Sequence, residues 1–371
     1  MQFFKRLPAQ SFVAAGGDSG ATQDLKLIPS AIDGRPVIVR SLQIRLNGTV
    51  TSTAGGAANL ARLLSRIQLS IPGIGDLVNL TGNEVVRIYR AERRGAYPPI
   101  GALTNAKVWD GVATLAPGAN AVDLTIVVDF ARPFAVDPDD TALPAALLRS
   151  GATLKFSYLA ALTDIIADCT AVNIAMTCKA VCALQSKAKA PVLTVLDSVG
   201  LVGSQPVVMP CPGRIMTAVI APDAQGVFPA GTDLTQVGFR AGNDEVFTEI
   251  GQTVRDYYNA FNDAASNPFE DHVDAQTHMN DSIPLTGPFA PGLESDHPAT
   301  TDAIGTGYPI ALNFDVAAHN YKLLRRFSYD QRSGQALAAI ALIGGTPQSA
   351  QPASGKQPPG GSGFNMPVTL A

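Results

Sequence analysis

The sequence predicts an all-β fold made of two tandem β-sandwiches, each with a short helix between strands. Three observations support this prediction. Apolar and polar residues alternate with a period of two in several short runs. The 34 glycines and 27 prolines lie throughout the chain and favour many short elements joined by turns. A strand, a Gly-Asn turn and a helical pattern follow one another near residue 82 and again near residue 242.

The alternating runs are the predicted strands. From Leu42 to Leu46, three aliphatic side chains point one way while Gln43 and Arg45 point the other. The remaining runs are residues 66–71, 124–130, 154–158 and 172–184. Many short strands bounded by turn residues are typical of a sandwich or a barrel. The last run places Cys178 and Cys182 on its inward face, where each would act as a small core residue.

Helical periodicity is clearest in the second half of the chain. Apolar residues recur there at i, i+4, i+7, i+8 and i+11, namely Ile250, Val254, Tyr257, Tyr258 and Phe261. Asn243 or Asp244 is the candidate N-cap. A weaker helix is predicted after Asn83, with Val85, Ile88 and Tyr89 on one side. Similar strands follow both helices, so the second copy of the repeat carries an insertion within Ala264–Gly307, which is predicted to be a long loop.

The repeat and the local composition divide the chain. Residues 1–24 form an N-terminal arm and residues 25–188 the first sandwich. Residues 189–345 form the second sandwich, with its loop insertion at 264–307. The seam between the two is the polar segment Ser186–Pro191. Residues 346–371 form a tail rich in Pro, Gly and Ser, which is either disordered or an extended arm that orders against a neighbouring subunit.

Composition narrows the function classes. The net charge of −4 argues against a protein whose whole surface grips nucleic acid. Basic clusters at Lys5-Arg6, Arg90–Arg94 and Lys322–Arg326 are interpreted as solvated faces or subunit contacts. The sequence has no recognisable signal peptide and no run of about 20 apolar residues. We therefore expect a soluble protein made in a cytoplasm, with its four cysteines reduced.

Catalytic motifs are sparse. The segment Gly17–Gly20 (GDSG) resembles a serine-protease nucleophile signature, but the first histidine, His272, follows this serine instead of preceding it. The acids of Asp137–Asp140 fit a proline-containing turn better than a glycosidase pair. The phosphate-binding, dinucleotide-binding and HExxH motifs are absent from the sequence. The sequence therefore predicts that the protein is not an enzyme.

One segment holds four candidate metal ligands: His272, Asp274, His278 and Asp281. Imidazole and carboxylate groups both bind divalent ions, and such an ion would clip neighbouring subunits together. Because their spacing fits no established zinc pattern, a solvated polar loop is the competing interpretation. No cofactor is expected, with a structural divalent ion left open.

The order of elements resembles the double jelly-roll major capsid proteins of tailless icosahedral viruses, especially membrane-containing bacteriophages such as tectiviruses and corticoviruses. In that family each of two jelly-roll sandwiches has a helix between its fifth and sixth strands. The resemblance covers about residues 25–345 and depends on element order. It is carried by Pro36–Val50, the Gly82-Asn83 turn and helix, Leu143–Tyr158, the strand ending near Leu184, Arg214–Ala221, the Gly242-Asn243 helix, Tyr308–Asp315 and Ala336–Ile343.

The resemblance implies a structural subunit, three copies of which form a pseudo-hexagonal capsomer that tiles an icosahedral virion shell. It also implies contacts with neighbouring capsomers and with minor capsid or vertex proteins, and no sequence-specific binding of nucleic acid. Near the N-terminus, apolar and basic side chains lie together in a pattern suited to an anionic membrane beneath the shell; these are Phe3, Phe4, Lys5 and Arg6.

Two other classes stay open. A carbohydrate-binding or cell-surface β-sandwich would need exposed aromatic platforms, but aromatic residues make up 6% of the chain and Trp109 is the single tryptophan in the sequence. A cupin-like jelly-roll enzyme would need two or three metal-binding histidines on barrel strands. Instead, three of the four histidines lie in the predicted loop and His319 stands alone.

Overall fold

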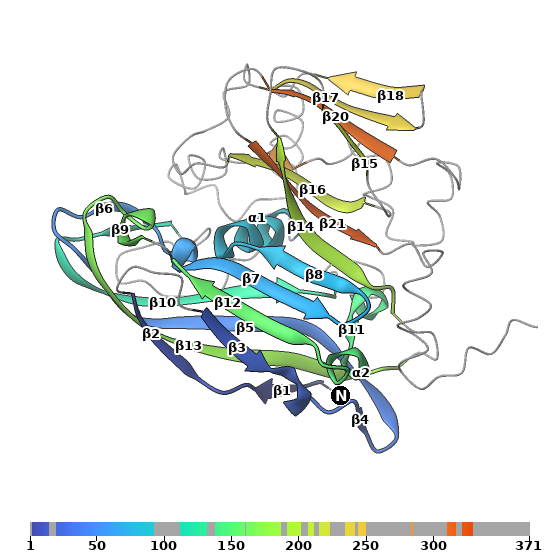
Figure 1. Cartoon of the computed structure of the whole chain (residues 1–371), viewed down its shortest axis with the longest axis horizontal. Coiled ribbons are helices and arrows are strands. Elements are labelled where there is room, and N and C mark those ends of the chain that lie inside the picture. Colours follow the sequence, from blue (N-terminus) through green and yellow to red (C-terminus); the bar gives the residue numbers. More distant parts are fainter. Residues whose placement is uncertain are drawn as a thin grey trace, which may run out of the picture.

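In the computed structural model, the part of the chain that is described consists mainly of β-strands (Figure 1). It describes residues 2–14, 20–92, 112–131, 138–159, 161–186, 191–201, 207–210, 215–222, 234–241, 244–249, 283–284, 310–316 and 321–328. The predicted metal-ligand segment, the helix at 250–261, the strand at 336–343 and the C-terminal tail lie outside these residues.

One face of the first sandwich is a seven-stranded sheet with the core order β1-β13-β5-β10. Its strands are β1 (Gln2–Arg6), β2 (Gln10–Ala14), β4 (Ala31–Ile32), β5 (Arg35–Ser52), β10 (Gly118–Asp129), β11 (Leu143–Pro144) and β13 (Cys169–Leu184). The two longest strands, β5 and β13, pair antiparallel along most of their lengths. The alternation seen in the sequence predicted the positions of β5, β10 and β13.

The opposite face belongs to an eight-stranded sheet that extends into the second half of the chain, in the order β19-β16-β21-β14-β8-β7-β12-β3. Its strands are β3 (Gly20–Asp24), β7 (Leu64–Ile71), β8 (Gly75–Leu80), β12 (Thr153–Tyr158), β14 (Thr194–Leu201), β16 (Ile215–Pro222), β19 (Ile283–Pro284) and β21 (Tyr321–Ser328). The halves meet where β14 pairs with β8 in parallel, through Leu196 opposite Val78 and Asp197 opposite Asn79.

The second sandwich is completed by a four-stranded sheet in the order β15-β20-β17-β18, which lies beyond β16 and β21 in Figure 1. Its strands are β15 (Val207–Pro210), β17 (Leu234–Ala241), β18 (Asp244–Glu249) and β20 (Ile310–Val316). The prediction that a helix follows directly after the Gly242-Asn243 turn, with Asp244 as one of its two candidate N-caps, is wrong. Asp244 begins strand β18, which pairs back on β17, so a helix does not begin there.

Short elements join the strands of the first half. They are the pair β6 (Gly56–Asn59) and β9 (Val112–Leu115), the helices α1 (Gly82–Glu92) and α2 (Ala145–Leu148), and the 3-10 turns Leu25–Leu27, Leu60–Leu63, Pro138–Thr141 and Leu162–Asp164. Helix α1 confirms the helix predicted after Asn83. Its residues Val85, Ile88 and Tyr89 are buried, as the apolar stripe requires.

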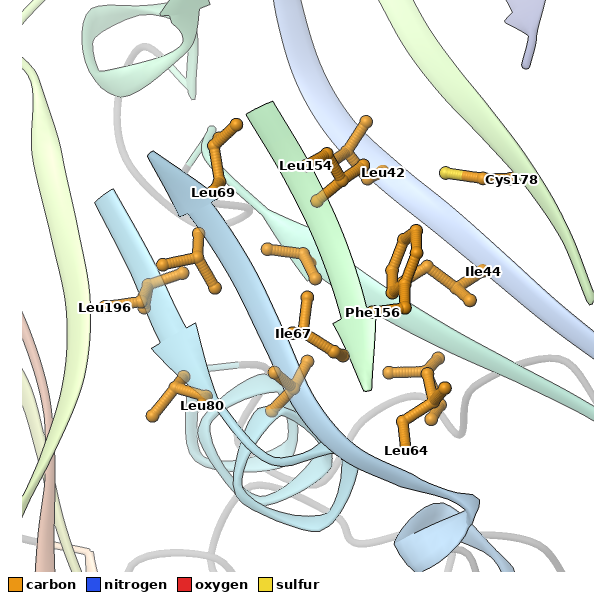
Figure 2. Close-up of a cluster of buried hydrophobic side chains, with 14 of the residues drawn as sticks. Leu42, Ile44, Leu64, Ile67, Leu69, Leu80, Leu154, Phe156, Cys178 and Leu196 are labelled. Atoms are coloured by element: carbon orange, nitrogen blue, oxygen red, sulfur yellow. The ribbon is translucent and has the colours of Figure 1, made fainter. Parts of the chain in front are cut away.

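The core of the first sandwich lies between the two large sheets (Figure 2). Leu42 and Ile44 of β5 face Ile67 of β7 and Phe156 of β12, and all four are at most 2% exposed. Cys178 and Cys182 of β13 belong to the same core, and both are buried, as predicted. Burial of this apolar surface stabilises the sandwich by about 25 cal/mol for each Å² removed from water.

Strand β5 keeps its apolar residues on the core side by means of a β-bulge. Val37 and Val39 face the core before it, and Leu42 and Ile44 do so after it, a step of three residues between Val39 and Leu42. The pairing with β13 skips Arg40 at this point. The carbonyl of Arg40 instead accepts the N–H groups of Phe130 and Ala131, at 2.8 and 2.9 Å. A bulge of this kind changes which face a strand presents.

Candidate functional site at the junction of the two halves

Helix α1 packs against β7 and β10 of the first half and against β16 and β21 of the second. Its first turn is anchored by a cap. The Thr81 hydroxyl accepts the backbone N–H of Glu84, at 3.2 Å, and the Glu84 carboxylate accepts the backbone N–H of Thr81, at 2.8 Å. This is a capping box, which satisfies backbone N–H groups that a helix start leaves without intrahelical partners. The spacing Thr81-x-x-Glu84 is the sequence signal for this cap.

The helix start also depends on a close backbone approach. A Cβ atom on Gly82 would lie 2.3 Å from the carbonyl oxygen of Ala61 and 3.0 Å from a methyl carbon of Ile126. Only glycine fits here without movement of the backbone. Beside it, the Asn59 side-chain amide donates to the Asn83 side-chain oxygen at 2.9 Å, with both residues buried. The entry of α1 is therefore held by packing and by buried hydrogen bonds.

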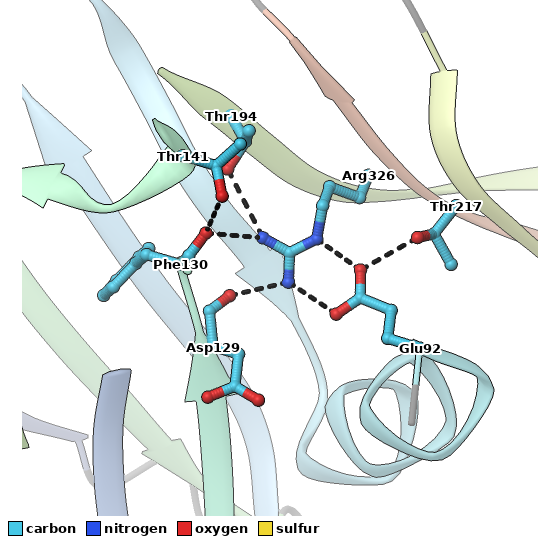
Figure 3. Close-up of polar contacts among 7 residues, drawn as sticks. All are labelled: Glu92, Asp129, Phe130, Thr141, Thr194, Thr217 and Arg326. Atoms are coloured by element: carbon cyan, nitrogen blue, oxygen red, sulfur yellow. Dashed lines mark hydrogen bonds and ion pairs between the residues drawn. The ribbon is translucent and has the colours of Figure 1, made fainter. Parts of the chain in front are cut away.

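At the other end of α1, Glu92 meets Arg326 of strand β21 in a buried ion pair that joins the first half to the second (Figure 3). The side chains are 3% and 1% exposed. The contact is bidentate: Nε of Arg326 donates to one carboxylate oxygen, and Nη2 donates to the other at 2.8 Å. Thr217 of β16 also donates to Glu92, at 2.9 Å.

The remaining N–H groups of Arg326 reach the first sandwich and β14. Nη2 donates to the backbone carbonyl of Asp129 at 2.6 Å. Nη1 donates to the carbonyl of Phe130 at 3.3 Å and to the Thr194 hydroxyl at 3.4 Å. With the two bonds to Glu92, each of the five guanidinium donors has an acceptor. A buried charge is tolerated only when it is paired and hydrogen-bonded in this way.

Two further ion pairs connect β21 to its surroundings. Arg325 makes a bidentate contact with Asp197 of β14, at 2.9 and 2.6 Å. The Nζ atom of Lys322 lies 3.2 Å from Oε1 of Glu84 in α1. The interpretation of Lys322–Arg326 as a solvated face or subunit contact is therefore wrong for its arginines: their side chains lie inside the molecule and neutralise acids of neighbouring elements.

A groove lined by both polar and apolar side chains opens beside the first turn of α1, with an empty volume of about 660 Å³ that includes the solvent at its mouth. Its lining includes Thr81, Glu84 and Asp164 from the first half and Lys322 from the second. The Lys322–Glu84 pair borders this groove, and because its lysine side chain is 30% exposed, solvent and salt screen the pair. The buried Glu92–Arg326 pair is consequently the stronger electrostatic link between the halves.

The buried thiols of β13, in the core of the first sandwich, are not suited to catalysis. Burial raises the pKa of the Cys178 thiol to about 12 and that of Cys182 to about 11, so both stay protonated at neutral pH and are poor nucleophiles. Among the described residues there is no cluster of three or more metal-binding side chains, and no helix is long and apolar enough to span a membrane. The predicted ligands His272, Asp274, His278 and Asp281 lie outside that part of the chain.

The structure places the predicted membrane-contact residues in a strand of the first sheet. Strand β1 pairs antiparallel with the end of β13, with Phe4 opposite Val181 and Arg6 opposite Lys179. Phe3 packs against the core, whereas Phe4 is 60% exposed. The contact of Phe3, Phe4, Lys5 and Arg6 with a membrane stays a prediction.

Comparison with known proteins identifies the fold. No family model matches the sequence, and no curated protein matches it significantly. The chain is similar to the crystal structure of the STIV MCP, with 14% identity and a TM-score of 0.57 over 91% of this chain and 99% of that chain. It is also similar to a chain in the atomic structure of Sulfolobus Turreted Icosahedral Virus, with 12% identity and a TM-score of 0.52 over 92% and 96% of the two chains.

These neighbours are viral major capsid proteins with the double jelly-roll fold. The match covers almost the whole of both chains, so it includes both sandwiches and their arrangement. The predicted fold class, two tandem jelly rolls, is confirmed. At this level of identity the comparison establishes the fold of the chain, and its role is argued below.

Proposed function

We propose that this chain is the major capsid protein of an icosahedral virus, a structural subunit located in the virion shell and without enzymatic activity. The observation that carries the proposal is the match to the STIV MCP over 91% of this chain and 99% of that one. A single β-sandwich serves many functions, so its presence would say little. Two jelly rolls in tandem, matched along almost their whole length, are a much narrower architecture.

The junction supports this role because a shell subunit must transmit load without hinging. One eight-stranded sheet runs through both halves, and the buried Glu92–Arg326 pair holds α1 against β21. We propose that three such subunits form a trimer, in which six sandwiches give a pseudo-hexagonal block. Such blocks would contact neighbouring capsomers and minor capsid or vertex proteins, with no sequence-specific binding of nucleic acid.

The test is the mass and shape of the purified chain. Light scattering after gel filtration is expected to give about 116 kDa, three times the chain mass of 38.6 kDa. Negative-stain electron microscopy should then show blocks with six-fold appearance, or closed particles at high concentration. A monomer under all conditions of concentration and salt would contradict the proposal.

The finer assignment is to membrane-containing bacteriophages of the tectivirus and corticovirus type. Its support is the N-terminal strand, which carries an exposed phenylalanine next to basic residues. A structural divalent ion bound by His272, Asp274, His278 and Asp281 is part of the same proposal, supported by the affinity of imidazole and carboxylate groups for such ions. Elemental analysis of the dialysed wild type and of the variants His272→Ala and His278→Ala tests for the ion. A divalent-metal content that is the same in both variants as in the wild type would contradict the proposal.

A further inference from the structure

We infer that the outer face of the first sheet carries a docking patch for an anionic lipid surface, formed jointly by β1 and β13 from Phe4, Arg6 and Lys179. The inference rests on the proposed function and deepens it. It assigns a role to Lys179, which lies far from the N-terminus in sequence. It also divides the four predicted membrane-contact residues: Phe4 and Arg6 face outward, whereas Phe3 and Lys5 do not.

The first step is the alternation of β1. Successive side chains of a strand point to opposite faces, so Gln2, Phe4 and Arg6 share one face and Phe3 and Lys5 the other. Burial agrees: Gln2, Phe4 and Arg6 are exposed, and Phe3 and Lys5 are partly buried. Phe3 packs against the core between the sheets. The outward face of β1 therefore consists of an aromatic residue between a polar and a basic one.

The second step is the pairing with β13. Arg6 lies directly opposite Lys179, so two cations stand side by side across the strands. The Lys179 ammonium is also 5.9 Å from the centre of the Phe4 ring, a cation–π distance. Like charges directly opposite each other destabilise a strand pair. Within the described residues neither cation of this pair has a salt-bridge partner, whereas Arg45 on the same sheet is paired with Asp123.

The third step is the identity of the partner. An exposed aromatic ring flanked by cations is the combination that anchors a surface in the headgroup region of a membrane. Lysine is depleted at protein–protein interfaces, and this patch depends on one. The chain as a whole has a net charge of −4, so anionic headgroups would repel the average surface and attract this face. These observations favour a lipid surface over a second copy of the chain.

The experiment is flotation of the full-length protein with vesicles of phosphatidylcholine containing about a third phosphatidylglycerol, compared with pure phosphatidylcholine. Each basic residue near such a surface contributes about fivefold to binding. We expect Arg6→Gln and Lys179→Gln to lower the partition coefficient about fivefold each, and the double variant about 25-fold. Phe4→Ala should lower it too, and salt should weaken the wild type. Lys155→Gln is the matched control, because Lys155 is an exposed lysine on β12 of the other large sheet.

Mass measurement of every variant separates this inference from the proposed function. Loss of vesicle binding with the trimer retained supports the patch. A wild-type trimer that ignores anionic vesicles overturns the inference and leaves the capsid proposal standing. Variants that bind vesicles normally but lose the trimer would also overturn it, because the patch would then be a contact between copies. Equal losses in Lys155→Gln would show that only the total charge matters, and would overturn it as well.

Discussion

Arg326 shows at the scale of one residue how a full charge is held inside this protein. Its side chain is 1% exposed, yet its guanidinium bonds a carboxylate, two backbone carbonyls and a hydroxyl. The planar fork of five donors suits such a set of acceptors, which a lysine could not satisfy. The cost of desolvation is offset only while Glu92 is present, so the two residues depend on each other.

Replacing Arg326 with Met leaves the Glu92 carboxylate buried without its partner. We expect Arg326→Met to lower the free energy of unfolding by about 3–5 kcal/mol. Arg45→Met is the control: its bidentate pair with Asp123 is largely exposed, and its loss should cost about 0–1 kcal/mol. Urea unfolding followed by fluorescence measures both. The double variant Glu92→Leu/Arg326→Met should recover part of the loss, and equal costs in the two single variants would contradict the argument.

Asp168 gives a prediction about acid. Its carboxylate accepts hydrogen bonds from the Ser52 hydroxyl, at 2.7 Å, and from the backbone N–H groups of Ala54 and Gly55. These bonds favour the ionised form and lower its pKa from 3.8 to about 2, with the Ser52 bond the largest contribution. The folded pKa is below the unfolded one, so the stabilisation is present above about pH 4 and is lost as the pH falls through 2.

The variant Asp168→Ala isolates this effect. The melting temperature of the wild type should exceed that of the variant at pH 7, and the difference should shrink between pH 4 and pH 2. Thermal scans of the two proteins at half-unit steps of pH measure it. A difference that stays constant down to pH 2 would show that the side chain acts through packing and not through its charge.

At the scale of the element, two strand glycines provide a matched pair. A Cβ on Gly48 of β5 would lie 2.0 Å from the carbonyl oxygen of Asn173 on β13, whereas a Cβ on Gly200 of β14 would meet no atom within 4 Å. Gly48→Ala should therefore destabilise the protein by about 1–3 kcal/mol, since one of the two longest strands must shift. Gly200→Ala should be neutral or slightly stabilising. Similar melting temperatures for the two variants would contradict the close approach of β5 and β13.

Strands in which buried and exposed residues alternate were the easiest to predict from the sequence. In β7 and β12, buried and more exposed residues alternate, so the period of two was visible in the sequence. Strand β21 has Leu323, Leu324, Arg325 and Arg326 buried in succession, and β14 and β16 flank it within the sheet. Its arginines made the segment look like a solvated cluster. Helix α1 was predicted because its single apolar stripe keeps the helical period.

At the scale of the whole molecule, the junction could not be read from the sequence. Glu92 and Arg326 are 234 residues apart, and neither lies in a motif. The parallel pairing of β14 with β8 likewise joins two segments that are far apart in the sequence, and the local pattern of neither segment predicts the pairing. Two tandem sandwiches were predicted, but the sheet that they share depends on long-range contacts that only the folded chain reveals.

The shared sheet predicts that the two halves stay together without a covalent link. A specific protease site inserted at residues 187–190, in the predicted seam, allows the chain to be cut after folding. The cut halves should co-elute on gel filtration at the mass of the uncut protein, because β14 remains paired with β8 and Arg326 remains bonded to Glu92. Denaturing electrophoresis confirms the cut, and urea should separate the pieces. In the Arg326→Met background the cut halves should separate at a lower urea concentration. Halves that part in native buffer would show that the covalent connection, and not the sheet, makes this chain a single block.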